Sequence, residues 1–253
     1  MKSRTLTCIT AITLFAALAL PVQVAAQHTH YIVTDLGTLG GTFGEANALN
    51  NKAWVVGDAN LPGDTVRHAF LWRKGLMKNL GTLGGPNSLA AALNERGEVT
   101  GFSDTSTPDP LKEDFCGFGT NLVCLPFLWQ NGAMAPLPTL GGSGQALEIN
   151  GRGQVVGVSE NTTPDPTCVD TPQVLHFEPV LWEKGETIHE LPTFPGDPDG
   201  VADAINDRGQ VVGQTGDCIS LSTGCSGITT RSWTWASSES FNSPQDTLIT
   251  KVK

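Results

Sequence analysis

The sequence has few of the features that helical, nucleic-acid-binding and membrane-spanning proteins need. It contains 29 glycines and 16 prolines among 253 residues and no helix-length run of helical periodicity, so a helical fold is excluded. Only 15 lysines and arginines stand against 25 aspartates and glutamates, which argues against nucleic-acid or anionic-membrane partners. No apolar stretch approaches the roughly 18 residues that a membrane-spanning helix requires. We therefore expect a β-rich protein with no membrane span.

The sequence also lacks the short motifs that mark common catalytic and metal sites. It has no Gly-x-Ser-x-Gly nucleophile turn, no phosphate-binding loop, no His-Glu-x-x-His motif and no dinucleotide-binding fingerprint. Its cysteines and histidines do not show the tight, repeated spacing of a zinc site. These absences favour a protein that is not an enzyme.

What the sequence does contain is a pattern that occurs four times. Each copy begins with Ala-x-x-Leu or Ala-x-x-Ile, followed by Asn, two polar residues and Gly, which Ala53 replaces in the first copy. A second apolar segment then ends in another Gly, seven residues after the Asn. The Asn residues stand 44, 56 and 56 residues apart, at Asn50, Asn94, Asn150 and Asn206. A period in this range is typical of stacked or circular repeat folds.

Each copy predicts a strand, a tight turn and a second strand. The reason is that an Asn side chain can bond to the backbone that follows it, and Gly tolerates the positive φ of a tight turn.

Two further motifs recur in step with this pattern. One has the form Leu-Trp-x-x-Gly, with its Trp at Trp72, Trp129 and Trp182 and a weaker copy without the Gly at 233–235. The other is related to Gly-Thr-Leu-Gly-Gly, with its Thr at Thr38, Thr82, Thr139 and Thr193. About four short strands in each unit predict an all-β, β-propeller-like fold of about four four-stranded blades, complete or part of a larger array. We expect the Trp residues to pack between blades. The expected units are 31–72, 76–129, 134–182 and 187–235, with a tail at 236–253.

The first 26 residues have the pattern of a secretory signal. Lys2 and Arg4 precede an apolar stretch from Ile9 to Leu20, and Val24-Ala25-Ala26 is a suitable cleavage site. Removal of this segment would change the formal net charge from −10 to about −12. We therefore expect a single repeat domain, 27–253, that is secreted to the extracellular space or the periplasm.

Five cysteines follow the signal, all in the longer connections between predicted strands. An exported protein meets an oxidising compartment, so disulfides are expected. The local pairs are Cys116 with Cys124 and Cys218 with Cys225. Cys168 is then left free or paired outside the chain.

The candidate ligand residues lie on the predicted innermost strands and in one turn. In a propeller these strands line a central channel, which would bring Asn47, Glu148 and Asp203 toward bound ligands. Glu148 and Asp203 would face each other as the paired carboxylates of glycosidases do, although a solvated channel or opposite strand faces would also account for them. Asp197 and Asp199 lie in an Asp-rich turn that would bind calcium if it bound any cofactor, without the full ligand spacing of a calcium loop.

The motifs His68-Ala69-Phe70-Leu71-Trp72, Leu36–Gly41 and Asn206–Gly213 resemble the HAF-repeat family of bacterial extracellular proteins. The resemblance covers most of 31–235, although His-Ala-Phe itself occurs only in the first unit. It implies an exported, repetitive, β-rich protein and assigns no catalytic residue.

Two functions remain open. The first is an exported, non-enzymatic binding module for a glycan or a protein, whose long loops or channel bind the ligand. The second is a secreted carbohydrate-active hydrolase or lyase, which needs two converging carboxylates. The missing motifs favour the first, and a fold by itself does not determine function.

Overall fold

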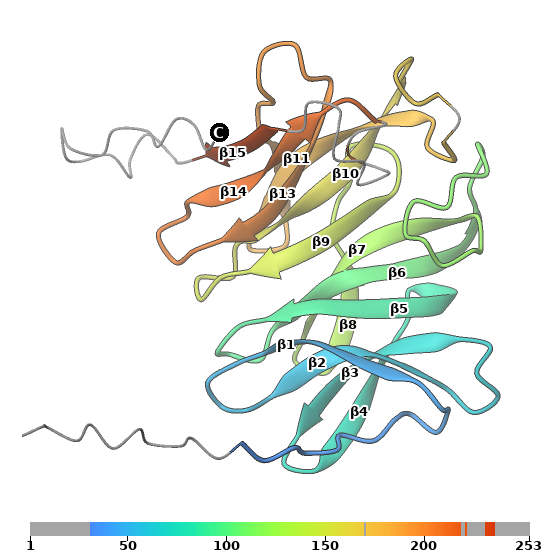
Figure 1. Cartoon of the computed structure of the whole chain (residues 1–253), viewed down its shortest axis with the longest axis vertical. Helices are drawn as coiled ribbons and strands as arrows, with labels where there is room; N and C mark the ends of the chain where they lie inside the picture. The colour runs from blue at the N-terminus through green and yellow to red at the C-terminus, as the bar shows by residue number, and fades with distance from the viewer. Residues whose placement is uncertain (1–30, 170, 219–220, 222–230, 236–253) are drawn as a thin grey trace, which may run out of the picture. The chain divides into compact units, whose positions relative to one another are not determined.

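The computed structural model describes residues 31–169, 171–218, 221 and 231–235. This part of the chain is all-β, and its antiparallel sheets are arranged as the four blades of a β-propeller (Figure 1), which confirms the predicted fold class. The predicted signal at 1–26 and the tail at 236–253 lie outside the described residues. Within the described residues, no helix has the length and apolar character needed to cross a membrane.

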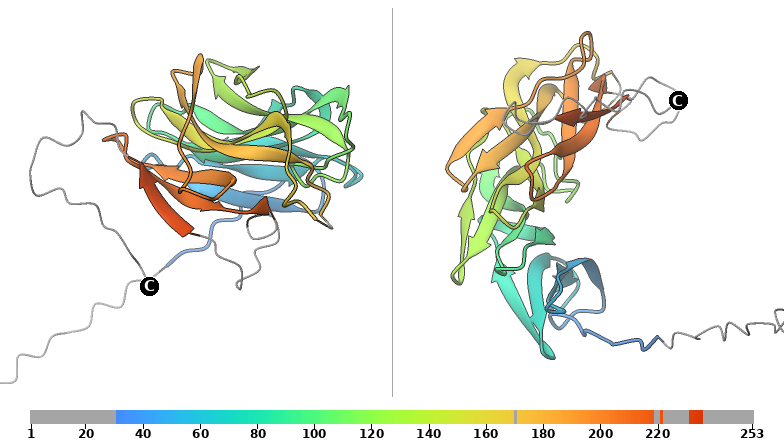
Figure 2. Two further views of the ribbon diagram at one scale, coloured as in Figure 1. Left: turned by 90° about the horizontal axis from the view of Figure 1, so that it is seen from above. Right: turned by 90° about the vertical axis from the view of Figure 1, so that its left-hand side faces the viewer.

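The sheets follow one another in chain order, as Figure 2 shows from two further directions. The first sheet contains β1 (Gly44–Leu49), β2 (Val55–Asn60), β3 (Arg67–Arg73) and β4 (Leu76–Gly81). The second contains β5 (Gly84–Leu93), β6 (Val99–Pro108), β7 (Leu122–Gln130) and β8 (Ala133–Pro136). The third contains β9 (Gly144–Ile149), β10 (Val155–Pro164), β11 (Leu175–Glu183) and β12 (Thr187–Glu190). The fourth contains β13 (Asp199–Ile205), β14 (Val211–Gly216) and β15 (Arg231–Trp235).

The strands are grouped one position later along the chain than in the predicted units. The segment beginning at Leu76 pairs with β3 and completes the first sheet, whereas the sequence units place it at the start of the second. The compact unit that holds all four sheets begins at Leu36.

The predicted turns form as expected from their sequence. In the third sheet, the Asn150 side-chain oxygen accepts hydrogen bonds from the backbone N–H groups of Arg152 and Gln154, both at 3.0 Å. Gly153 has a φ of +83°, which L-residues adopt only with strain. The other three turns repeat these bonds, through the side chains of Asn50, Asn94 and Asn206.

The Gly that closes each pattern has a different physical reason. Each first strand contains a bulge, where the register shifts relative to the second strand. The bulge turns a carbonyl toward this Gly, so a Cβ built on Gly157 would lie 2.0 Å from the carbonyl oxygen of Gln145. No side chain fits there, and Gly57, Gly101 and Gly213 meet the same restriction.

The hydrophobic core lies between successive sheets. Val56 and Leu71 of the first sheet pack against Leu93, Val99 and Trp129 of the second. The same arrangement recurs between the second and third sheets, around Trp182, and between the third and fourth, around Trp235. The prediction that the recurrent Trp residues pack between blades is therefore confirmed for these three positions.

Candidate ligand-binding site

The sheets have two unlike ends. At one, called the turn end, the four Asn turns join the first and second strands of the sheets. They surround a shallow cavity of about 450 Å³ lined by residues from all four turns, such as Asn50, Asn94, Asn150 and Asn206. At the opposite end, called the loop end, longer connections join the second and third strands.

The turn end is held together by a chain of hydrogen bonds from sheet to sheet. The Asn50 Nδ2 donates to the Asn94 carbonyl at 3.1 Å, and the Asn94 Nδ2 donates to the Asn150 carbonyl at 3.2 Å. The Asn150 Nδ2 continues the series to the carbonyl of Asn206 at 3.0 Å. We call this series the Asn ladder. Its amides bond to protein groups, so the ladder explains these residues structurally.

Of the predicted channel residues, Asn47 and Asp203 occupy the same bulge position of their first strands, whereas Glu148 lies one residue later in the repeat. Asn47 Nδ2 donates to the Ala90 carbonyl at 3.0 Å and thus links the first two sheets. Glu148 pairs with Val156, and paired residues share a face, so its side chain lies on the face that packs against the fourth sheet. Burial raises the pKa of Glu148. Asp203 stands in the bulge of β13, where it is exposed and accepts a bond from Gln214 at 3.3 Å.

At the loop end, two related sequence stretches build similar turns. Asp109 and Asp165 follow the same Thr-Pro pattern, and both carboxylates are buried. Asp109 accepts bonds from the backbone N–H groups of Leu111 and Glu113, at 2.8 and 3.1 Å. Asp165 does the same for Thr167 at 2.7 Å. Each loop is therefore ordered around its own aspartate.

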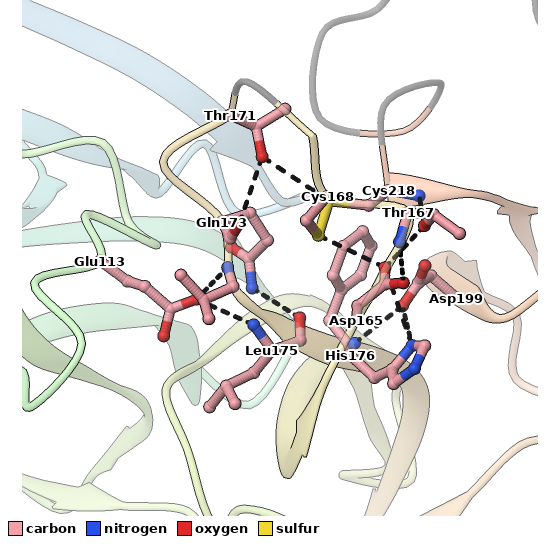
Figure 3. Close-up of a disulfide and its surroundings, with 12 residues drawn as sticks. Glu113, Asp165, Thr167, Cys168, Thr171, Gln173, Leu175, His176, Asp199 and Cys218 are labelled. Atoms are coloured by element: carbon pink, nitrogen blue, oxygen red, sulfur yellow. Dashed lines mark hydrogen bonds and ion pairs between the residues drawn. A yellow bond between two sulfur atoms is a disulfide. The ribbon is translucent and has the colours of Figure 1, made fainter.

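A buried carboxylate joins these two loops to each other. Glu113, 1% exposed, extends from the β6–β7 loop and accepts bonds from the backbone N–H groups of Val174 and Leu175, where the β10–β11 connection enters β11, at 2.5 and 3.0 Å (Figure 3). Glu160 is a fully buried residue of β10. Its carboxylate accepts hydrogen bonds from the Gln173 side chain and from the Ser143 backbone N–H, both at 2.7 Å. Burial, with the neighbouring Glu113 carboxylate, raises the pKa of Glu160 to about 7.

A second cluster lies where the third and fourth sheets meet. Figure 3 shows His176 beside Asp199, 3.1 Å from Nδ1 to Oδ1, with an Asp165 oxygen 3.7 Å from the same nitrogen. Burial and the adjacent Asp165 raise the pKa of Asp199 to about 8. Ligand atoms of the three side chains lie within 4.8 Å of one another, and this donor set is one that zinc accepts.

The predicted calcium pair is engaged with separate partners. Asp199 is fully buried and accepts a bond from the Phe177 backbone at 3.1 Å, whereas Asp197 accepts one from the Thr215 hydroxyl at 2.7 Å. Asn87 and Ser143 stand at the positions equivalent to Asp199. Their side chains accept hydrogen bonds from backbone N–H groups of β3 and β7, respectively. The Asp199 carboxylate thus has a repeated structural role, and calcium binding stays a prediction.

The disulfides confirm one predicted pair and correct the other. Cys116 bonds to Cys124 within the β6–β7 loop, as predicted. Cys218 bonds to Cys168, so the predicted Cys218–Cys225 pair is wrong, as is the expectation that Cys168 is free or paired outside the chain. Local spacing favoured the nearer partner, whereas packing of the third sheet on the fourth brings the distant one into reach. Cys225 lies outside the described residues.

A cavity of about 350 Å³ opens among these loops, and we call it the loop pocket. Its apolar lining includes Phe115 and Phe177, whose rings meet edge to face with centroids 6.4 Å apart. Its remaining lining residues are Asp114, Gln145, Val158, Thr171, Pro172, Gln173, Val201 and Leu221. Aromatic surface combined with a few amide and hydroxyl groups is typical of small-ligand sites, and the volume lies in their range.

The sequence offered the long loops and the channel as alternative locations for binding, and its candidate residues were those of the channel. The loop pocket lies among the long loops. The residues that sequence reasoning missed are Phe115, Gln145, Thr171, Gln173 and Phe177. The related Thr-Pro-Asp-Pro stretches were the available signal, because they show that two loops share one construction.

No protein-family model matches this chain, and a comparison with curated proteins finds no significant match. The resemblance to HAF repeats therefore rests on the motifs of the sequence alone.

Proposed function

We propose that the protein is an exported, non-enzymatic binding module that takes a saccharide unit of a glycan in the loop pocket. The observation that carries this proposal is the pocket itself, which combines the half-buried ring of Phe115 with the amide of Gln145 and the hydroxyl of Thr171, while the buried Phe177 and Gln173 support them from behind. A sugar presents the matching surfaces, an apolar ring face and a rim of hydroxyl groups.

The construction of the pocket supports a preorganised site. The Gln145 Nε2 donates to the Phe115 carbonyl at 2.9 Å, and the Gln173 Nε2 is shared between Glu160 and the Leu175 carbonyl. These bonds fix the side chains before a ligand arrives, which lowers the entropy that binding must overcome. Two disulfides indicate an oxidising compartment, which supports the proposal of export.

The hydrolase alternative has weaker support. Two pairs of carboxylates lie together, Asp165 with Asp199 and Glu113 with Glu160, and none of the four is more than 6% exposed. A general acid must reach its substrate within hydrogen-bond distance. Glu148 and Asp203 occupy different register positions. Hydrolysis of an oligosaccharide that is lost in both Glu148→Gln and Asp203→Asn would favour the alternative over our proposal.

The test is direct binding of a panel of soluble oligosaccharides to the full chain, measured by calorimetry. We expect at least one saccharide to bind without turnover, and Phe115→Ala to weaken that binding at least tenfold. Thr171→Val, which removes only a hydroxyl and keeps the side-chain shape, should weaken it less but measurably.

The matched control is Phe43→Ala, because Phe43 is 46% exposed and lies just before β1, outside the loop pocket. Its saccharide affinity should equal that of the wild type. Failure of the folded wild type to bind any saccharide, or equal loss in the Phe43 variant, would overturn the proposal.

A further inference from the structure

Each interior sheet has two apolar faces with distinct roles. The receiving face, toward the preceding sheet, carries an Ala, a Leu or Ile, a Val and a Trp, for example Ala146, Ile149, Val155 and Trp182 in the third sheet. The donating face, toward the following sheet, centres on one residue of the second strand, which is Val56 in the first sheet, Thr100 in the second and Val156 in the third. Three contacts of this kind hold the four sheets together.

The first sheet has a complete receiving face that no described residue covers. Leu49 occupies the position of Leu93, Ile149 and Ile205, which are 7%, 4% and 8% exposed, yet Leu49 is 73% exposed. The remaining positions of this face are Ala46, Val55 and Trp72, which are exposed or half-buried where their equivalents in the other three sheets are buried.

The fourth sheet has the converse, a donating face that no residue in the described part of the chain covers. Val212 pairs with Ala204 and Thr234, as Val56 pairs with Ala48 and Leu71 in the first sheet. Val56 is fully buried beneath the second sheet, whereas Val212 is 46% exposed. The two ends of the array thus present the two halves of a contact that recurs three times inside it.

The hydrogen-bonding groups at the turn end are also matched between the fourth and the first sheet. The Asn206 Nδ2 bonds to its own turn, at the Gln210 Oε1, in the way that the Asn150 Nδ2 bonds to the Gln154 Oε1. The Asn150 Nδ2 additionally donates to the next sheet. The carbonyl of Asn50 is the group that the Asn206 amide of a second molecule would meet if the Asn ladder continued between molecules.

We propose that the protein self-associates head to tail, with the donating face of the fourth sheet in one copy bound to the receiving face of the first sheet in another. Continuity with the three internal contacts is the argument, because the incoming sheet would use the same positions and the same ladder bond. Such a contact is heterologous, and it either closes into a ring or extends. This inference does not depend on the proposed saccharide binding.

The experiment measures the absolute mass of the full chain by light scattering over a concentration series. We expect masses above that of the monomer, rising with concentration. Leu49→Lys and Val212→Lys each place a charge on one face, so each variant alone should be monomeric. A mixture of the two retains one intact receiving face and one intact donating face, so it should form a dimer of one copy of each.

The control is Leu111→Lys, because Leu111 is 45% exposed in the β6–β7 loop, away from both faces, and should associate as the wild type does. Circular dichroism and melting temperature establish that each variant folds. A wild type that stays monomeric at every concentration would overturn the proposal, and would point to coverage of these faces within one chain. Folded single variants that still associate, or a mixture that stays monomeric, would overturn it equally.

Discussion

The turn end and the loop end of the sheets are built in opposite ways. At the turn end, each turn is formed by residues within four positions of one Asn, and the same bonds appear in all four sheets. At the loop end, Glu113 bonds to a backbone group 61 residues away, and Cys168 bonds to a cysteine 50 residues away. The difference indicates that the turn end provides the repeated scaffold, whereas the loop end carries what is individual to this protein.

The sharpest test of the comparison removes the distant covalent link of the loop end. Replacing both Cys168 and Cys218 with Ala should lower the free energy of unfolding by about 4 kcal/mol, since the closed loop is long. The same change at Cys116 and Cys124, eight residues apart, should lower it by only about 2.5 kcal/mol. Urea unfolding under oxidising conditions measures both. Equal losses would show that loop length does not set the effect.

At the turn end, the largest effect is expected from Gly157→Ala. The added Cβ would lie 2.0 Å from the Gln145 carbonyl oxygen, so the bulge must shift, at about 3 kcal/mol. Gly44→Ala is the matched control, because its Cβ would find the nearest atom at 3.5 Å. Thermal unfolding should separate the two variants clearly. A Gly157 variant as stable as the Gly44 variant would contradict the role of the bulge.

The buried carboxylate of Glu160, at the loop end, predicts that the stability of the fold depends on pH. The folded protein raises the pKa of Glu160 from 4.5 to about 7, so it holds a proton that the unfolded chain has lost in this range. The contribution to stability is thus greatest below about pH 4.5 and falls as pH rises through 7.

Glu160→Gln removes the charge but turns an amide NH2 toward one of the two N–H donors, so it should lower stability at pH 4 and compare more favourably with the wild type at pH 8, by on the order of 2 kcal/mol. Chemical denaturation at both pH values compares the variant with the wild type. Exposed Glu45→Gln, in β1, is the control and should show no such difference. A pH-independent effect of Glu160→Gln would contradict the prediction.

The smallest expected effect is a gain at the one irregular Asn turn. Ala53 stands where the other copies have Gly and has a φ of +54°. Ala53→Gly should relieve this strain and raise stability by roughly 0.5–1 kcal/mol. Ala133→Gly, at an exposed strand position, should instead lower it. A loss in the Ala53 variant, measured by the same unfolding assay, would show that the first turn differs from the others.

The same comparison explains how much the sequence could predict. The Asn turns were predictable because Asn150 accepts hydrogen bonds from backbone N–H groups no more than four residues away. Tertiary contacts are therefore not needed to form these turns. The fold class followed from their repetition. The Cys168–Cys218 disulfide and the Glu113 bridge were not predictable, because they depend on how successive sheets bring distant loops together. The grouping of strands was missed for a related reason: the Leu76 segment is the neighbour of β3 in the chain and in the sheet, but the motifs do not mark where one sheet ends.

The Asn ladder has a consequence for the evolution of the gene. Every rung joins a side chain to the same backbone atom in the next unit, so a rung does not depend on how many units precede or follow it. In-frame duplication or deletion of the stretch between two equivalent positions, such as Gly101 and Gly157, would therefore leave every remaining rung as the same bond, from an Asn side chain to the Asn carbonyl of the next unit. Recombination can therefore vary the length of the array while selection acts separately on the loops that each unit carries.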